Sequence, residues 1–304
     1  MSQFRPNIAR QSLRDKVVLV TGGANGIGAS LVEYCCENGA YVCFGDTGIA
    51  AGEQLSKRLC ESDSSSSHPR AIFLRTDVTD YQSLLYLFDA ALKAYGCIDH
   101  VVAAAGIMEI GNCFDPALDL KTVREAPTTK VLDVNLVGSI YVSRIASVYL
   151  RQSRPANTDR SITLFSSLAG FKESPGLFIY QTSKHGILGL MRALRLYLSN
   201  SPVHNIRVNV VCPWMTATGM ADGVCEGWVK AGLPLNTPLD VAKVTAGLLV
   251  DSSLNGKAMY VEGGRAWEIE GNLDRLEPQW LGEEPSRSLA KGQAVLGQGM
   301  DWAK

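Results

Sequence analysis

A phenol and an ammonium group stand four positions apart in the segment YQTSK, as Tyr180 and Lys184. On a helix these two side chains would rise from the same face, one turn from each other. Such a pair could form a catalytic device, but a Tyr and a Lys at this spacing also occur by chance on protein surfaces. The rest of the chain must supply a cofactor, a third group and a pocket before the first interpretation is preferred.

A hydroxyl and an amide precede this pair in the chain. Ser167, in SSLAG, stands at the end of a predicted buried strand over 161–167, and Asn135, in DVNLVG, lies in a predicted helix over 129–150. In open parallel sheets, ligands bind beyond the carboxyl ends of the strands. We therefore expect Ser167 to point into the crevice that would hold a cofactor.

A glycine-rich turn, VTGGANGIG, follows the first predicted strand and opens the first predicted helix. Gly22, Gly26 and Gly28 have the spacing G-x3-G-x-G, which differs from the common GxGxxG dinucleotide pattern, and Asn25 and Ile27 lie between them. A turn without side chains lets the backbone approach a pyrophosphate, and a helix N-terminus offers unpaired N–H groups to the anion. The turn predicts nucleotide binding, although glycines here could also be purely structural.

Acidic residues end the next two predicted strands. Asp46 can accept both ribose hydroxyls of adenosine and would repel a 2′-phosphate, and position 25 is Asn rather than a cation that could hold that phosphate. Both features favour NAD over NADP, while the alternative for Asp46 is a cap or turn residue. Asp77 and Val78 are expected near the adenine, although Asp77 or Thr79 could instead cap the following helix.

Apolar runs of strand length alternate with amphipathic stretches from residue 16 onward, which predicts a parallel sheet covered by helices on both faces. We expect one doubly wound Rossmann-type α/β domain over 14–264, with an N-terminal arm (1–13) and a C-terminal extension (265–304). The seven predicted strands are 16–21, 40–46, 70–77, 100–106, 161–167, 205–213 and 256–264. The predicted helices are 29–38, 49–59, 83–95, 129–150, 180–199 and 240–250.

The bulk composition excludes several classes of protein. The 304 residues carry a net charge of −1, which gives no reason to expect nucleic acid or an anionic membrane as a partner. No stretch approaches the roughly 18 uninterrupted apolar residues of a membrane-spanning helix, and the polar N-terminus lacks the apolar run of a secretory signal. The eight cysteines show no CxxC spacing and the four histidines no metal-ligand spacing. We expect a cytoplasmic protein with buried thiols and no metal.

Taken together, these residues resemble the short-chain dehydrogenase/reductase family, through TGxxxGxG (21–28) and YxxxK (180–184), over nearly all of 14–264. The resemblance implies that Tyr180 exchanges the proton of a substrate hydroxyl. Lys184 and the positive nicotinamide would lower the phenol pKa, and Lys184 would also hold the nicotinamide ribose. Ser167 would hydrogen-bond the substrate oxygen. Asn135 would seat a water that links Lys184 to solvent.

Two segments depart from the family pattern. The family's NNAG motif after the fourth strand appears here as AAAG (103–106). The two missing side-chain amides should alter the stability of the protein more than its catalytic chemistry. Pro-Gly appears as Pro213–Trp214, and Trp214 should crowd the nicotinamide. The resemblance places further cofactor contacts at Ala104, Ala105, Gly106, Pro213, Met215, Thr216 and Thr218.

The segment 213–237 would cover the substrate. Trp214, Met220 and Trp228 make it apolar and aromatic, so with Ser167 and Tyr180 it should bind a hydrophobic alcohol or ketone. We expect a cyclic secondary alcohol oxidised by NAD. The alternatives are an NAD-bound enzyme with a net non-redox cyclisation or isomerisation, and a silent dinucleotide-binding regulator.

The family usually forms dimers or tetramers through two long helices, here 130–150 and 179–199, so a homodimer or homotetramer is expected. The tail tryptophans at 267, 280 and 302 could close the pocket or pack on another subunit.

Overall fold

The computed structural model describes residues 3–8, 12–61, 68–153, 155, 157–201 and 203–296. A sheet lies at its centre, with strand order β1-β9-β8-β7-β6-β5-β2-β3-β4. Strands β2 to β8 run parallel, and β9 and β1 add an antiparallel edge. The strands are β1 Gln3–Phe4, β2 Val17–Thr21, β3 Tyr41–Asp46, β4 Ala71–Arg75, β5 His100–Ala103, β6 Ser161–Phe165, β7 Arg207–Pro213, β8 Ala258–Glu262 and β9 Arg265–Glu268.

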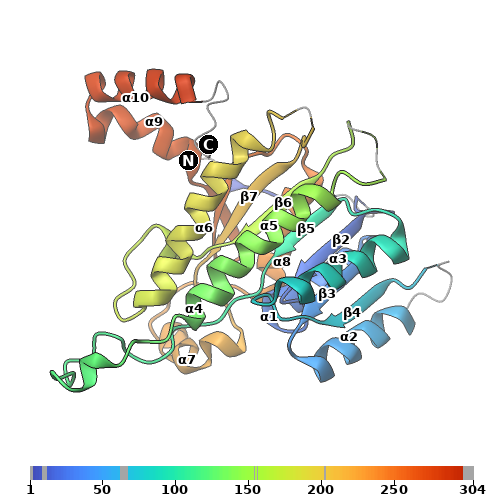
Figure 1. Ribbon diagram of the computed structural model, residues 1–304, viewed down its shortest axis with the longest axis horizontal. Coiled ribbons are helices and arrows are strands. Elements are labelled where there is room, and N and C mark those ends of the chain that lie inside the picture. Colours follow the sequence, from blue (N-terminus) through green and yellow to red (C-terminus); the bar gives the residue numbers. More distant parts are fainter. Residues whose placement is uncertain are drawn as a thin grey trace.

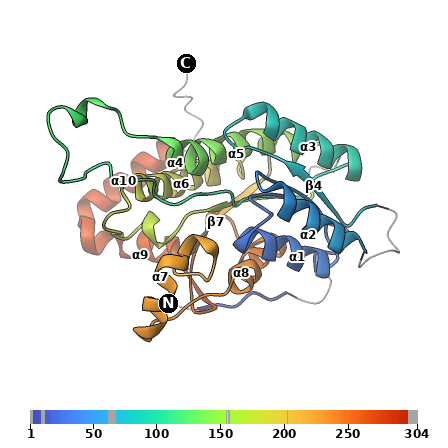
Figure 2. The same ribbon diagram turned by 90° about the horizontal axis from the view of Figure 1, so that it is seen from below.

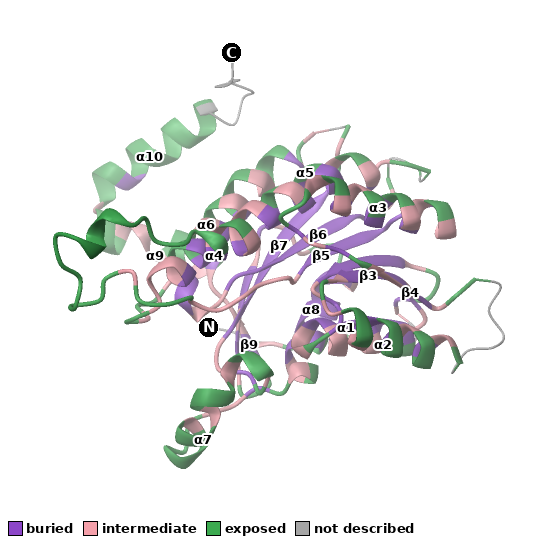
Figure 3. Ribbon diagram, turned by 60° about the horizontal axis from the view of Figure 1, so that its bottom comes forward, coloured by how far each residue is buried: buried purple, intermediate pink, exposed green. Residues whose placement is uncertain are grey.

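Helices cover both faces of this sheet. Figure 2 and Figure 3 show α3, α5 and α6 on one face and α1, α2 and α8 on the other. Every residue of β2, β5, β6 and β7 is buried, as expected for strands that pack on both sides. The helices are α1 Gly26–Glu37, α2 Ile49–Glu61, α3 Tyr81–Tyr95, α4 Lys130–Leu132, α5 Gly138–Tyr149, α6 Phe178–Tyr197, α7 Asp222–Lys230, α8 Pro238–Val250, α9 Glu270–Leu281 and α10 Glu283–Leu296.

The predicted doubly wound α/β fold is confirmed, and the described residues form nine strands rather than the seven predicted. The two additional strands lie in segments that we expected to be an arm and an extension. After β8, Gly263 and Gly264 both adopt positive φ, which glycine tolerates, and the chain turns back as β9. β1, only two residues long, then pairs with β9.

The predicted helix over 129–150 contains a local change of winding. A π-helical turn over Asp133–Val137 separates α4 from α5. The run Lys130–Tyr149 is long and apolar enough to cross a membrane by length and composition alone. It packs against α3 and the sheet, however, as a core helix does.

After β9, the described part of the C-terminal extension forms a hairpin of two helices, α9 and α10, at the end of α6 (Figure 1). The buried carboxylate of Glu270 joins α9 to this helix, because it accepts two hydrogen bonds from Arg192, at 2.9 and 2.8 Å, and one from Arg195 at 3.2 Å. Trp267 packs on Tyr260 in the sheet, and Trp280 is exposed. Residue 302 lies outside the described residues.

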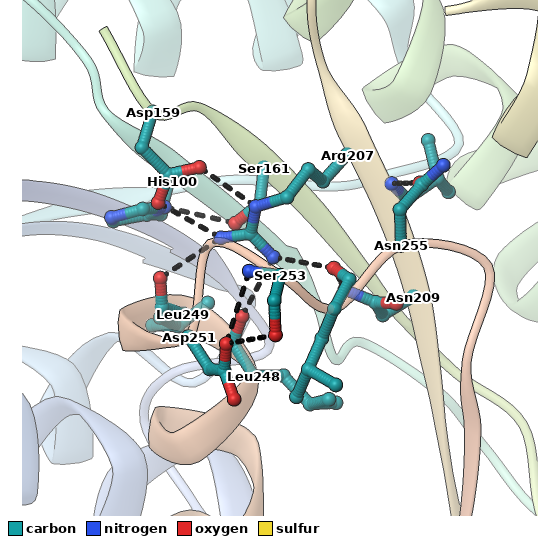
Figure 4. A network of polar contacts seen from close by, with 12 residues as sticks. His100, Asp159, Ser161, Arg207, Asn209, Leu248, Leu249, Asp251, Ser253 and Asn255 are labelled. Atoms are coloured by element: carbon teal, nitrogen blue, oxygen red, sulfur yellow. Dashed lines mark hydrogen bonds and ion pairs between the residues drawn. The ribbon is translucent and has the colours of Figure 1, made fainter. Parts of the chain in front are cut away.

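A polar network ties the amino ends of the central strands together (Figure 4). The Arg207 guanidinium donates two hydrogen bonds to Asp159, at 2.7 and 3.0 Å, and others to the carbonyls of Leu248 and Leu249 at the end of α8. Beside it, a nitrogen of His100 lies 2.8 Å from the Ser161 hydroxyl. This network stabilises the end of the sheet opposite the carboxyl ends of the strands.

All eight cysteines are free thiols and five are buried. They act as small apolar side chains in the core.

Candidate active site

A cleft of about 950 Å³ opens beyond the carboxyl ends of β2, β3, β4 and β5. This is where ligands bind in open α/β sheets. The glycine turn, the ends of β3 and β4 and the segment after β5 form its walls. The predicted cofactor residues that line it are Gly22, Asn25, Gly26, Ile27, Gly28, Asp46, Asp77, Val78, Ala104, Ala105, Gly106 and Thr218.

Close packing explains the glycine turn. A Cβ on Gly22 would lie 2.6 Å from the backbone of Ala105, and one on Gly28 would lie 1.9 Å from the Gly22 oxygen. At the N-terminus of α1, the Asn25 side chain makes no capping bond, and the first turn holds no acidic residue. The helix end on the cleft wall is therefore electrostatically suited to an anion.

Asp46 combines a structural role with free acceptor capacity. One carboxylate oxygen accepts the N–H of Ala24 at 3.0 Å and the other accepts the N–H of Gly48 at 2.9 Å. A carboxylate offers about four acceptor positions, so about two remain for a ligand. Arg75 is the register partner of Asp46 on β4, which places a cation on the adjacent strand.

Two acidic residues after β4, Asp77 and Asp80, have different roles. The Asp77 carboxylate accepts the N–H of Thr79 at 2.9 Å and its hydroxyl at 2.7 Å. These hydrogen bonds lower the Asp77 pKa. The N-cap of α3 is Asp80, which accepts the N–H of Gln82. The alternative that Asp77 or Thr79 caps this helix is therefore wrong.

Ser167, Tyr180 and Lys184 come together beyond the carboxyl end of β6, beside the cleft, although none of the three is among the residues that line it. Burial raises the Tyr180 pKa, and a hydrogen bond with the Ser167 side chain acts in the opposite direction. The Nζ of Lys184 lies 5.4 Å from the centre of the Tyr180 ring and donates to the Phe165 carbonyl at 3.1 Å. Burial lowers the Lys184 pKa to about 8. The pair on one helix face is thus present and desolvated.

Asn135 lies in the π-helical turn and holds the wall of the cleft. Its side-chain oxygen accepts the N–H of Ile107 at 2.8 Å, and its amide donates to the Ile107 carbonyl at 3.0 Å and the Ser183 hydroxyl at 3.1 Å. A Cβ on Gly106 would lie 3.3 Å from the Asn135 oxygen and 3.5 Å from the Lys184 nitrogen. Asn135 and Lys184 therefore lie directly behind Gly106.

The segment 213–237 is only partly on the cleft. Met220 lines it, whereas Pro213, Trp214, Met215, Thr216 and Trp228 do not. The Trp214 ring packs edge-on against Trp228, with ring centres 5.1 Å apart. Thr216 is buried and bonded to Asn236 at 3.4 Å. Both contacts join residues within the segment 213–237 and stabilise its conformation.

Sequence reasoning missed Glu109, which follows β5 and bonds to the start of α6. Its two carboxylate oxygens accept the N–H groups of Ile179 and Tyr180. The sequence contains only an indirect indication: Leu177, the residue before the helix, has no side-chain oxygen that could cap it, so another residue must do so.

No group of three or more His, Cys, Asp or Glu side chains in the described part of the chain could hold a metal ion.

Comparison with known proteins places this geometry in context. A family model described as short chain dehydrogenase matches residues 16–227. The short-chain dehydrogenase/reductase ascJ of Acremonium egyptiacum is 35% identical, over 86% of this chain and 83% of its own length. The 5'-hydroxyaverantin dehydrogenase of Dothistroma septosporum is 29% identical, over 93% and 95% of the two chains. The (+)-borneol dehydrogenase 1 of Salvia officinalis is 31% identical, over 83% and 94%.

A solved structure, that of gox2181, is similar in fold. It has a TM-score of 0.69 and 24% identity, and the match covers 84% of this chain and 97% of the other.

Proposed function

Because the chain belongs to the short-chain dehydrogenase family, we propose that it uses NAD to interconvert a hydrophobic cyclic secondary alcohol and its ketone. One observation carries the proposal. Ser167, Tyr180 and Lys184 are grouped beside the cleft that Asp46 lines, because Lys184 bonds to the carbonyl of Phe165 and lies behind Gly106, two residues of the cleft lining. That arrangement combines a dinucleotide site with a group able to move a proton.

The cleft residues fit a dinucleotide. The uncapped N-terminus of α1 suits the pyrophosphate, and the remaining acceptor positions of Asp46 suit the adenosine ribose hydroxyls. Lys184, behind Gly106, would hold the nicotinamide ribose, and Asn135 beside it would seat a water that links Lys184 to solvent. When bound, the nicotinamide supplies the hydride acceptor.

Asp46 supports NAD, but cations also lie near the adenosine end. Arg75 and Lys130 both lower the pKa of Asp77 electrostatically, and either could meet a 2′-phosphate. The preference for NAD therefore depends on Asp46 repelling that phosphate more than these cations attract it.

The side chains grouped beside the cleft would share the proton chemistry. The Tyr180 hydroxyl exchanges its proton with the substrate oxygen, and the Ser167 hydroxyl donates a hydrogen bond to the same oxygen. Burial of Tyr180 and Lys184 excludes water from the transfer and strengthens their electrostatic interaction with charge that develops there.

Apolar side chains support a hydrophobic substrate. Met220, Val224, Val229 and Leu233 are all exposed on the segment that includes α7. Relatives named as dehydrogenases of (+)-borneol and of 5'-hydroxyaverantin are consistent with a hydroxylated ring compound.

The test is an assay of the purified protein with NAD⁺ or NADP⁺ and a panel of cyclic secondary alcohols. We expect reduced nicotinamide to accumulate with NAD⁺, together with a product lighter by two hydrogen atoms. Product of unchanged mass would support the non-redox alternative. Cofactor binding without any product from the panel or from a metabolite extract would support the regulator.

We also propose that the protein self-associates through the outer faces of α5 and α6. Ile140 and Val148 on α5, and Leu196 and Tyr197 on α6, are exposed apolar side chains that a second subunit would cover. Light scattering coupled to gel filtration should give the mass of a dimer or tetramer, and a monomer at micromolar concentration would contradict this.

A further inference from the structure

The helix that carries Tyr180 and Lys184 is capped from a distant part of the chain. Glu109, about 70 residues upstream, accepts the N–H of Ile179 at 3.1 Å and the N–H of Tyr180 at 2.6 Å. Helix starts are usually capped by a side chain of the preceding residue, but Leu177 provides no such bond. A carboxylate at this helix end is also favoured by the helix dipole.

These two bonds complete a closed circuit of hydrogen bonds beside the cleft, which the circuit reaches at Ile107. The Asn135 side chain bonds to the backbone of Ile107 and to the Ser183 hydroxyl. The Ser183 hydroxyl donates to the Tyr180 carbonyl at 2.6 Å, and the Tyr180 N–H returns to Glu109, two residues after Ile107. The Tyr180 N–H is therefore bonded directly to the segment after β5, and its carbonyl is linked to that segment through Ser183 and Asn135.

We propose that Glu109 is a positioning residue for the reaction, which holds the first turn of α6 so that the Tyr180 hydroxyl faces the reacting oxygen. This inference depends on the proposed function. The capping of the Ile179 and Tyr180 N–H groups by Glu109 does not depend on it, and can be measured by hydrogen exchange without any substrate.

The charge and both acceptor oxygens of Glu109 are needed for this role. Glu109→Gln keeps the size of the side chain but leaves one acceptor oxygen and puts an N–H₂ donor against a backbone N–H. The matched control is Glu125→Gln, the same change at an exposed residue of the same connecting segment. A second control, Asp159→Asn, weakens the network at the opposite end of the sheet and tests for general destabilisation.

Two measurements are made on the wild type and the three variants. In hydrogen exchange followed by mass spectrometry, Glu109→Gln should speed exchange in the peptide 177–184 by about fivefold or more, as loss of a helix cap does. In the assay, Glu109→Gln should lower kcat by about 10- to 100-fold, because misplacement of a reacting group is costly, while KM for NAD stays within about twofold. Both controls should keep the wild-type kcat and the wild-type exchange of this peptide.

Unchanged exchange in the peptide would overturn the capping role. Faster exchange with an unchanged kcat would overturn the positioning role and leave the proposed function intact. A wild type without oxidoreductase activity would instead contradict the proposed function, and the exchange result would still decide whether Glu109 holds Tyr180. A kcat lowered equally by Asp159→Asn would assign the effect to global stability and reject positioning.

Discussion

The Nζ of Lys184 lies 5.4 Å from the centre of the Tyr180 ring, one helical turn away and equally buried. Burial keeps the phenol pKa above its ordinary value of about 10, although Ser167 acts against this shift. Near neutral pH the Tyr180 hydroxyl therefore carries its proton in the free protein. The acidification that we expected from the sequence would require the further positive charge of a bound nicotinamide.

Replacement of this hydroxyl tests its role directly. Tyr180→Phe keeps the ring that packs against Val131 and Ala169 but removes the proton donor. We expect kcat to fall by about 10²- to 10⁴-fold, the usual contribution of a general acid or base. The affinity for NAD, measured by fluorescence titration, should stay close to that of the wild type. A parallel loss of NAD binding and turnover would show that Tyr180 serves the cofactor site instead.

Lys184 should leave a signature in the pH dependence of stability. Burial lowers its folded pKa from about 10.5 to about 8, so between these values the unfolded chain binds more protons. The free energy of unfolding must therefore rise with pH across this range, and the full cost of burying the charge is present below pH 8.

A comparison with Lys184→Met isolates this effect from the other groups that titrate at alkaline pH. Between pH 8 and 10.5 the wild type should gain about 3 kcal/mol relative to the variant, from about 1.4 kcal/mol per pKa unit. Urea unfolding of both proteins at several pH values measures the difference. Parallel profiles would mean that the ammonium is solvated in the folded protein.

Asp46 should decide the choice between NAD and NADP. Asp46→Ala removes the acceptor for the ribose hydroxyls and one of the carboxylates near Arg75, its register partner. The Kd for NAD should rise by about 10- to 100-fold, as expected for loss of hydrogen bonds to a charged group, and the preference should shift toward NADP. Asp80→Asn, at an exposed carboxylate outside the cleft lining, serves as the control and should leave both affinities unchanged. An unchanged ratio of the two affinities would argue against contact between Asp46 and the ribose.

Much of the fold and site follows from local patterns. The glycine turn, Asp46 and the spacing of Tyr180 and Lys184 are short-range features, and strand order then brings them to one edge of the sheet. Periodicity also predicted the buried strands, because residues buried on both faces form continuous apolar runs.

The features that sequence reasoning missed depend on contacts between distant segments. The bonds from Glu109 to α6 join residues about 70 positions apart, and no local pattern marks either end. The pairing of β1 with β9 joins the first residues to the extension. The Trp214 ring packs against the Trp228 ring. The replacement of Pro-Gly by Pro213–Trp214 does not by itself indicate this partner.

The AAAG segment leads to a prediction about stability. Thr21 ends β2, and its register partner on β5 is Ala103, where the family pattern has an amide. The buried Thr21 hydroxyl finds no hydrogen-bond partner among the described residues. An unsatisfied buried hydroxyl costs free energy, so an apolar group of the same shape should be tolerated.

Thr21→Val should therefore leave the free energy of unfolding unchanged or raise it by about 1 kcal/mol. The matched control is Thr245→Val on α8, where an equally buried hydroxyl donates to the Val241 carbonyl at 2.8 Å. That change should cost about 1 kcal/mol, because a satisfied hydrogen bond is lost. Urea denaturation of both variants compares them. Equal destabilisation of the two variants would mean that the Thr21 hydroxyl does have a hydrogen-bond partner in the folded protein. That partner would then replace the amides that AAAG lacks.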